Sequence, residues 1–380
     1  MHEINLNDTQ AMRWPHPVRV DHVTQGPYEQ MFLEQAGVWE HLKPYLADES
    51  TTTEWLLNNV PGMSALAHGI SNTPGSLNLG LLSLILARAR LRAHQDPLLQ
   101  VTPWLQQELL ATDMGDQLPV SFLRSPYTMT YIELHRPSGL QVFNRESGWH
   151  EVEGAYIGMY TAVDHHPLHQ NRSRVRHLRL DPRKPTRVVE LVITGSPAGK
   201  RHVLDDASQN TMLFIQDEDE ALGSVLQRHE AYNLNQSSLT MPSYVLPTQD
   251  EVQATRQVIQ FLIKVLLYLN LPEAQQQMML ERTELQQRIQ RLGPKKSAKL
   301  SRRLSRVYDR ILIGPPGVPQ WHSDAGVGEG GSKRPHWRRG HFRRILFGQG
   351  KSESKLGWIK PVLVNADQFG HAKPKVYQLR

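Results

Sequence analysis

The sequence contains no cysteine among its 380 residues, and aromatic residues make up only 7% of it. Without cysteine the chain has neither disulfides nor thiolate metal sites, which suits a reducing compartment. Residues 1–10 are polar and acidic, whereas a secretory signal begins basic and then turns apolar. We therefore expect a cytoplasmic protein.

The chain also lacks a long hydrophobic run. Its most apolar stretch, residues 77–87 with the sequence LNLGLLSLILA, is shorter than the roughly 20 apolar residues that a membrane-spanning helix needs. Arg88, Arg90 and Arg92 follow it at once. The stretch therefore predicts a buried helix, and we expect no membrane partner.

The two ends of the chain differ in charge. Residues 295–380 hold 19 Lys and Arg but only 5 Asp and Glu, a balance of +14. The preceding 294 residues hold 24 basic and 32 acidic residues, a balance of −8. An acidic body joined to a basic end indicates a polyanionic partner, most often nucleic acid. A solvated basic surface, or a clamp between the basic end and the acidic body, would give the same composition.

Apolar periodicity predicts an α+β fold of a length that accommodates two or three domains. Alternation of apolar and polar residues, as in 188–193, and the short connection at 135–139 favour a mainly antiparallel central sheet. We expect a mainly helical region at 1–125, a β-rich region at 126–245, a helical hairpin at 246–300 and a small basic C-terminal β-hairpin module at 301–380 with a loop at 314–332. Helices are predicted at 28–46, 52–58, 77–94, 104–111, 218–230, 249–269 and 272–292, and strands at 129–134, 140–143, 152–162, 188–194, 211–215, 337–347 and 357–364.

Residues 334–344, with the sequence RPHWRRGHFRR, carry five arginines, two histidines and two aromatics around one glycine. Arginines interleaved with aromatics supply charge for phosphates and flat faces for bases. We predict a nucleic-acid surface here, made of Arg334, Trp337, Arg338, Arg339, Phe342, Arg343 and Arg344.

Catalysis is the alternative for the same block. His336 and His341 have the chemistry of a general base and acid for RNA cleavage, with Arg339 stabilising the developing charge. On a straight strand Trp337, Arg339, His341 and Arg343 would share one face, and His336, Arg338, Phe342 and Arg344 the other. The two histidines would then point apart, which favours binding over cleavage.

A second basic run, which contains Arg172, Arg174 and Arg176, is a further candidate phosphate surface or a charged sheet edge. Asp164, His165, His166, His169 and His177 have no clear metal-ligand spacing, so we predict no metal site. The acidic run 217–220 is expected at a helix start, where the helix dipole favours it. The glycine-rich stretches lack a phosphate-loop pattern, and no cofactor is expected.

The block 334–344, followed by a glycine-containing turn and residues 357–364 (GWIKPVLV), resembles the C-terminal signature of the type V-A anti-CRISPR family carried by phages and plasmids. The resemblance implies a protein that recognises the nascent N-terminal peptide of a Cas12-type effector nuclease and lowers the effector's messenger RNA. The basic module would then contact messenger or ribosomal RNA. A stand-alone RNA endonuclease of the toxin type and a non-catalytic RNA-binding regulator are the alternatives.

Overall fold

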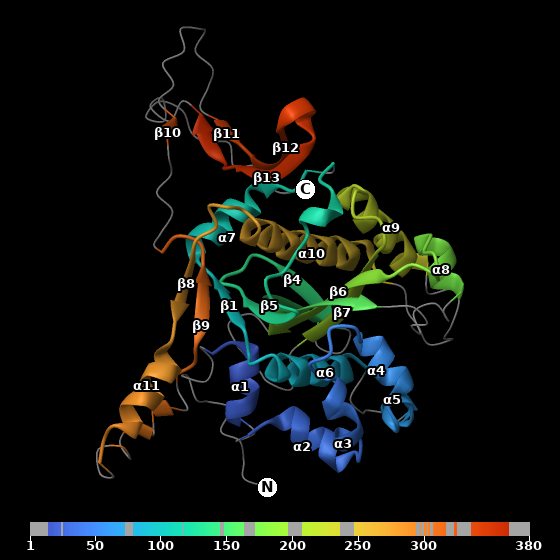
Figure 1. Ribbon diagram of the computed structural model, residues 1–380, viewed down its shortest axis with the longest axis vertical. Helices are drawn as coiled ribbons and strands as arrows, with labels where there is room; N and C mark the ends of the chain where they lie inside the picture. The colour runs from blue at the N-terminus through green and yellow to red at the C-terminus, as the bar shows by residue number, and fades with distance from the viewer. Residues whose placement is uncertain are drawn as a thin grey trace.

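The computed structural model describes residues 14–364 apart from 24–25, 73–78, 116, 145–147, 163–171, 197–206, 236–246, 294–296, 298–299, 302, 305–306, 317–322 and 325–335. Within these residues the chain folds around an eight-stranded sheet with helices on both of its faces (Figure 1). This arrangement confirms the predicted α+β class.

The central sheet is mixed but mostly antiparallel. Its strand order is β7-β6-β5-β3-β1-β9-β8, with β4 paired to β5. Strand β1 pairs in parallel with both β3 and β9, and the other neighbours are antiparallel. The strands are β1 Leu98–Val101, β3 Met129–Glu133, β4 Gln141–Asn144, β5 Gly148–Ala162, β6 Thr186–Ser196, β7 Ala207–Ile215, β8 Gln276–Met279 and β9 Arg310–Ile313.

Alternation along the strands sends side chains into two separate cores. In β5, Ala155 and Ile157 join the larger cluster, which includes the apolar face of the helix at 249–269. Tyr156 and Tyr160 point the other way and pack with the helix at 79–93. Because successive strand residues face opposite sides, one strand builds both layers.

The N-terminal helices cover one face of the sheet, with α6 nearest to the strands (Figure 1). Part of this interface is polar: Arg19 donates to Glu153 at 2.5 and 3.1 Å, and the guanidinium of Arg90 lies 3.8 Å from the ring centre of Tyr160. The helix expected at 52–58 begins after Thr52, whose hydroxyl accepts from the backbone of Trp55. The helices are α1 His16–Val23, α2 Tyr28–Gln35, α3 Trp39–Leu42, α4 Thr53–Asn59, α5 Met63–Asn72 and α6 Leu79–Ala93.

The opposite face is covered by α7 (Pro103–Leu110) and the long helix α10 (Gln249–Leu269). Helix α10 starts with a capping box between Thr248 and Glu251 and has the predicted bounds. Beside them are α8 (Arg172–Leu178) and α9 (Leu222–Asn235). No helix among the described residues is long and apolar enough to cross a bilayer.

The second helix predicted after α10, at 272–292, is partly wrong. The structure places strand β8 at Gln276–Met279 and limits the helix to α11, Glu281–Gln290. Glutamine and methionine favour helices in isolation, but β8 pairs antiparallel with β9, and this tertiary pairing outweighs local propensity. The expected helical hairpin thus contains an edge strand of the central sheet.

Candidate nucleic-acid interface

The basic C-terminal segment forms one long β-hairpin. Strands β11 (His336–Arg338) and β12 (Gly340–Phe347) run antiparallel to β14 (Val362–Val364) and β13 (Glu353–Ile359). His336 pairs with Val364, and His341 pairs with Ile359. Both steps are five residues along the two antiparallel strands, so one register continues through both halves of the hairpin.

The ladder is interrupted where Arg339 lies opposite Pro361 and Gly340 lies opposite Lys360. Proline has no backbone N–H and cannot donate a hydrogen bond across a ladder. At this point the backbone N–H of Gly340 turns to the body and donates to the carbonyl of Ala111 at 3.1 Å. Strand β12 thereby pairs in parallel with β2 (Thr112–Asp113). Strands β11 and β14 form a second small sheet with β10, Ser323–Asp324.

Apolar side chains anchor the hairpin to the body. Phe342 is 2% exposed, and its ring stacks on Trp358 with centres 5.8 Å apart. Trp358 in turn meets Trp104 and Tyr268 edge to face, and its Nε1 donates to the hydroxyl of Thr112 at 3.1 Å. The anchor therefore belongs to the main core of the protein.

A buried lysine supports the strand to which the hairpin binds. The ammonium of Lys264, on α10, donates to the carbonyls of Leu109 at 2.6 Å and Thr112 at 2.9 Å. The carbonyl of Leu109 lies in the last turn of α7, where carbonyls need donors from outside the helix, and that of Thr112 lies in β2. Burial lowers the pKa of Lys264 to about 8; the charge of Asp113 opposes the shift and that of Arg339 adds to it.

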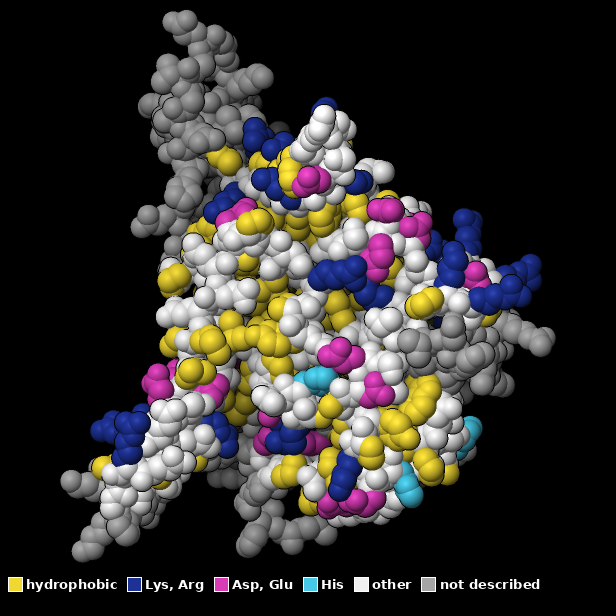
Figure 2. Space-filling view, viewed as in Figure 1, with side chains coloured by type: hydrophobic (Ala, Val, Ile, Leu, Met, Phe, Trp, Pro, Cys, Tyr) yellow, Lys and Arg dark blue, Asp and Glu magenta, His cyan; other side chains and the backbone are white. Residues whose placement is uncertain are grey.

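The exposed part of the hairpin is strongly basic. Residues 336–364 hold seven Lys and Arg and one acidic residue, Glu353, a balance of +6. Lys and Arg side chains gather around the hairpin at the top of the molecule (Figure 2). Arg338, Arg343 and Arg344 are exposed and form no ion pair with any described residue. This charge is available to an external anion.

The one ion pair between the hairpin and the body, within the described part of the chain, joins Arg339 to Asp113 at 3.3 Å. Both side chains are about 60% exposed, at 62% and 60%. A pair in such contact with water is screened and contributes little to stability. This ion pair therefore contributes little to holding the hairpin in place.

The predicted residues of the block fall into three groups. The side chains of Arg338, Arg339, Arg343 and Arg344 are exposed on the hairpin. Phe342 is buried, so its ring cannot stack on a base, and we leave it out of the interface. Arg334 lies outside the described residues, as do the side chains of His336 and Trp337.

The two histidines lie on different strands in different small sheets. His336 is on β11 and His341 on β12, with the interruption at Arg339 between them. His341 is half-buried, and its neighbour across the ladder is the apolar Ile359. On its other side His341 is the register partner of Asp113 on β2, and this carboxylate pairs with Arg339. A paired-histidine mechanism stays a prediction.

The second basic run lies on α8, at the right of the molecule and away from the hairpin (Figure 1). Arg174 forms an ion pair with Glu54 at 2.5 Å, and its guanidinium lies over the ring of Phe214 at 4.9 Å. It therefore holds α8 to the fold. Arg176 is exposed, whereas the side chain of Arg172 lies outside the described residues.

The acidic run 217–220 precedes α9 and is used in ion pairs. Glu218 pairs with Arg187 at 2.7 Å and with Arg124 at 3.2 Å, and Glu220 pairs with Arg228. Burial would raise the pKa of Glu218, but the hydrogen bonds and charges of Arg187 and Arg124 lower it.

The described residues contain no group of three or more potential metal ligands. Of the histidine-rich segment considered above, Asp164, His165, His166 and His169 lie outside the described residues.

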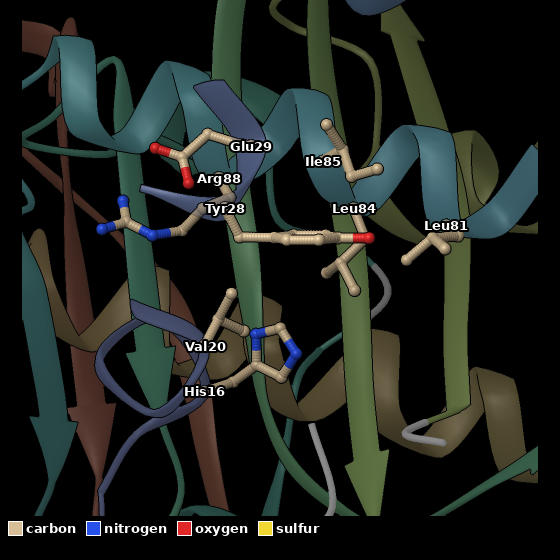
Figure 3. Close-up of a pocket in the computed structure, with 8 residues that line it drawn as sticks. All are labelled: His16, Val20, Tyr28, Glu29, Leu81, Leu84, Ile85 and Arg88. Carbon is tan, nitrogen blue, oxygen red and sulfur yellow. The ribbon is translucent and has the colours of Figure 1, made fainter. Parts of the chain in front are cut away.

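Far from the hairpin, a small cavity lies between α1, α2 and α6 (Figure 3). Its polar lining is already engaged: Arg88 pairs with Asp21 at 2.8 Å, and Nδ1 of His16 lies 3.0 Å from the hydroxyl of Tyr156. Burial and the charge of Arg19 lower the pKa of His16 to about 3, so its ring is neutral. We interpret the cavity as a gap in the packing between helices and not as a binding site. The remaining lining residues are Val20, Tyr28, Glu29, Leu81, Leu84 and Ile85.

Several residues of this interface escaped the sequence reasoning. Lys355 and Phe347 lie together near the tip of the hairpin, with the ammonium 5.7 Å from the ring centre. Lys360 lies over the rings of Trp104 and Trp358 at the base. Lys355 was missed because the strand was predicted to begin at 357, whereas β13 begins at Glu353. The partners of Lys360 come partly from a distant helix.

Comparisons with known proteins match most of the chain to one family. A model of the AcrVA2-like family, described as the anti-CRISPR type V subtype A2 family, matches residues 99–366, which is 268 of the 380 residues. A solved structure, titled "Crystal structure of AcrVA2", covers 90% of this chain and 99% of its own, with a TM-score of 0.46 and 14% sequence identity. A search of curated proteins found no match. The family match runs from β1 to just beyond the basic hairpin and confirms the resemblance seen at 334–364. The chain therefore belongs to the AcrVA2-like family of type V subtype A2 anti-CRISPR proteins.

Proposed function

We propose that this protein lowers production of a type V-A effector nuclease by recognising the effector's N-terminal peptide during translation, while its basic hairpin contacts RNA. Membership of an anti-CRISPR family supports an effector of this type as the target. The observation that carries the RNA contact is the exposed hairpin at 336–364, with its balance of +6 and three arginines without an ion pair in the described structure. Action on a nascent chain places the protein in the cytoplasm.

The acidic body is the proposed reader of the peptide. Residues 1–294 carry a balance of −8, which attracts a lysine-containing segment. Strand β8 ends the described sheet, and its residues are largely exposed. An extended peptide binds such an edge through backbone hydrogen bonds, and side-chain pockets then supply specificity.

The first experiment measures effector messenger RNA in cells that co-express this protein. One effector gene has an intact start, and a second is frame-shifted over its first codons with almost unchanged nucleotides. We expect loss of transcript only with the intact peptide. Equal loss from both genes would show that RNA is read directly and would refute peptide recognition.

The second experiment tests the hairpin. Arg343→Gln with Arg344→Gln removes two exposed charges from it, and Arg183→Gln with Lys184→Gln removes two exposed charges from a distant turn. We expect only the hairpin pair to weaken RNA binding and to reduce its salt dependence, by about 0.7 in logarithmic slope for each lost phosphate contact on a single strand. Equal behaviour of the two double variants would refute the assignment.

Binding is proposed in preference to RNA cleavage because His336 and His341 lie on strands of different small sheets. Asp113, the acidic neighbour of His341 on β2, already pairs with Arg339. The distinction is measurable with His336→Ala and His341→Ala. Loss of activity with RNA affinity retained would indicate catalysis by these groups. Unchanged activity would exclude it.

A further inference from the structure

The two faces of the outer hairpin differ in composition. Along β12, Phe342 and Leu346 point to the same side, and Phe342 buries that side against the body. The opposite side points away from the body. We call it the outer face; on β12 it is formed by His341, Arg343, Ile345 and Phe347. Their partners on β13 are Ile359, Gly357, Lys355 and Glu353, so one carboxylate is the partner of Phe347.

Phe347 is the exposed aromatic of the outer face. Its side chain is 42% exposed, although burying a phenyl ring is favourable by a few kcal/mol. The ammonium of Lys355 lies 5.7 Å from the ring centre, within the range of a cation–π contact. The ring is thus held from one side by a cation and remains accessible to a second flat group.

The neighbouring positions give this face a level surface. Gly357 pairs with Arg343, and a Cβ added at Gly357 would lie 2.4 Å from Cδ1 of Ile345. The isoleucine side chain therefore occupies the space above the glycine. Arg343 is exposed beside it and forms no ion pair with a described residue.

On this face of the hairpin Arg343 and Lys355 outnumber Glu353, so it favours a ligand that is anionic and that presents flat apolar surfaces. An acidic peptide supplies the charge without the flat surface, and a double helix keeps its base faces stacked inside. Single-stranded nucleic acid supplies both, because its bases are free to stack on aromatic side chains while phosphates meet Lys and Arg.

We propose that the outer face of the hairpin binds single-stranded RNA, with one base stacked on Phe347 and the adjoining phosphates on Arg343 and Lys355. This inference rests on the proposed RNA contact and specifies its substrate. Stacking is tolerant of sequence, so the contact takes any unpaired segment of a message. Selection among messages then falls to the peptide reader.

The test compares Phe347→Ala with Leu346→Ala in the full chain. Leu346 is a matched control because it is the next residue, is 48% exposed and points to the other face. The probe is an unstructured adenosine homopolymer, and titrations at several salt concentrations give affinity and salt slope. We expect Phe347→Ala to weaken binding about tenfold with an unchanged slope, and Leu346→Ala to leave both unchanged. Phe347→Trp should bind at least as tightly as the native chain.

Lys355→Gln should lower the affinity and also reduce the salt slope by about 0.7, as expected for one phosphate. Parallel titrations use an RNA duplex and heparin. Equal affinity for all three ligands, with no effect of Phe347→Ala, would mean an unspecific polyanion surface and would overturn the inference.

The failures of the two proposals are separable. If the native chain binds no RNA of any kind, the proposed RNA contact fails and the inference fails with it. If the native chain binds the homopolymer and Phe347→Ala matches Leu346→Ala, the RNA contact stands and the stacking site is wrong. Unchanged thermal unfolding of each variant confirms that the fold is intact.

Discussion

Replacing Gly340 by alanine should loosen the hairpin from the body. At this residue β12 approaches β2 so closely that an added Cβ would lie 2.6 Å from the hydroxyl oxygen of Thr112, 2.7 Å from Cδ of Pro361 and 2.8 Å from the carbonyl oxygen of Ile359. All three distances are below van der Waals contact. A methyl group fits only if the strands separate.

The neighbours have little freedom to yield. The hydroxyl of Thr112 donates to the carbonyl of Glu108 at 2.7 Å and accepts from Trp358, the Pro361 atom belongs to a rigid ring, and the third neighbour is backbone. Forcing an extra methyl group into a packed site typically costs about 1–3 kcal/mol. We expect a loss of stability in that range.

Urea unfolding followed by fluorescence measures this loss, and Gly293→Ala is the control because no atom lies within 4 Å of its added Cβ. Hydrogen exchange of the hairpin amides should quicken in Gly340→Ala while that of β5 and β6 changes less. If both glycine variants unfold at the same urea concentration, and hairpin exchange is unchanged, the close approach of β12 to β2 is not what holds the hairpin.

Three further measurements test the interior. The pKa of Lys264 is lowered from 10.5 to about 8, so the folded state holds this proton less firmly than the unfolded chain. The free energy of unfolding should therefore rise as pH increases from about 8, by up to about 1.4 kcal/mol per pH unit. Lys264→Met should remove that rise. The buried ring of His229 has its pKa lowered to about 4, so stability should fall as pH decreases from 6.5 towards 4, and His229→Gln should flatten this part of a pH titration of urea midpoints. Arg19→Met leaves the carboxylate of Glu153 buried without its guanidinium and should lower the free energy of unfolding in urea by about 3–5 kcal/mol. Adding Glu153→Leu should restore most of that stability. If it restores none, the loss comes from packing and not from the unpaired charge.

Local sequence signals were sufficient to predict those elements whose ends are marked by residues within or next to them. Helix α10 was predicted at 249–269 because apolar residues recur at helical spacing between Thr248 and Asn270, and the structure gives the same bounds. The antiparallel strands β3 to β7 were likewise found within a few residues, since each alternates or is rich in β-branched residues.

Long-range pairing was the part that local patterns could not show. Strands β1 and β9 have four residues each and lie about two hundred residues apart, yet they pair in parallel within the sheet. Strand β8 exists because β9 lies beside it, and its glutamine and methionine content predicts a helix instead. Such strands are defined by their neighbours in space.

The candidate site was located by sequence, but its orientation was not. Both faces of the block at 337–344 carry arginine and an aromatic, so alternation alone did not reveal which face turns inward. The choice depends on Trp104 and Tyr268, which form the aromatic pocket for Trp358 and come from α7 and α10. Phe342 follows Trp358 into the core as its neighbour across the ladder.

The composition alone permits a basic end clamped to an acidic body, and the contacts of the hairpin decide against this reading for the described residues. Its anchor is apolar, made of Phe342, Leu356 and Trp358, and the one ion pair that reaches the body is exposed on both sides. An arginine held by a body carboxylate would have to exchange that partner for a phosphate. Losing the first ion pair would cancel much of the binding free energy that the second provides. An apolar anchor avoids this competition, since RNA binding then breaks no contact that holds the hairpin. The arrangement therefore permits tight, salt-dependent RNA binding while the rest of the fold stays as it is.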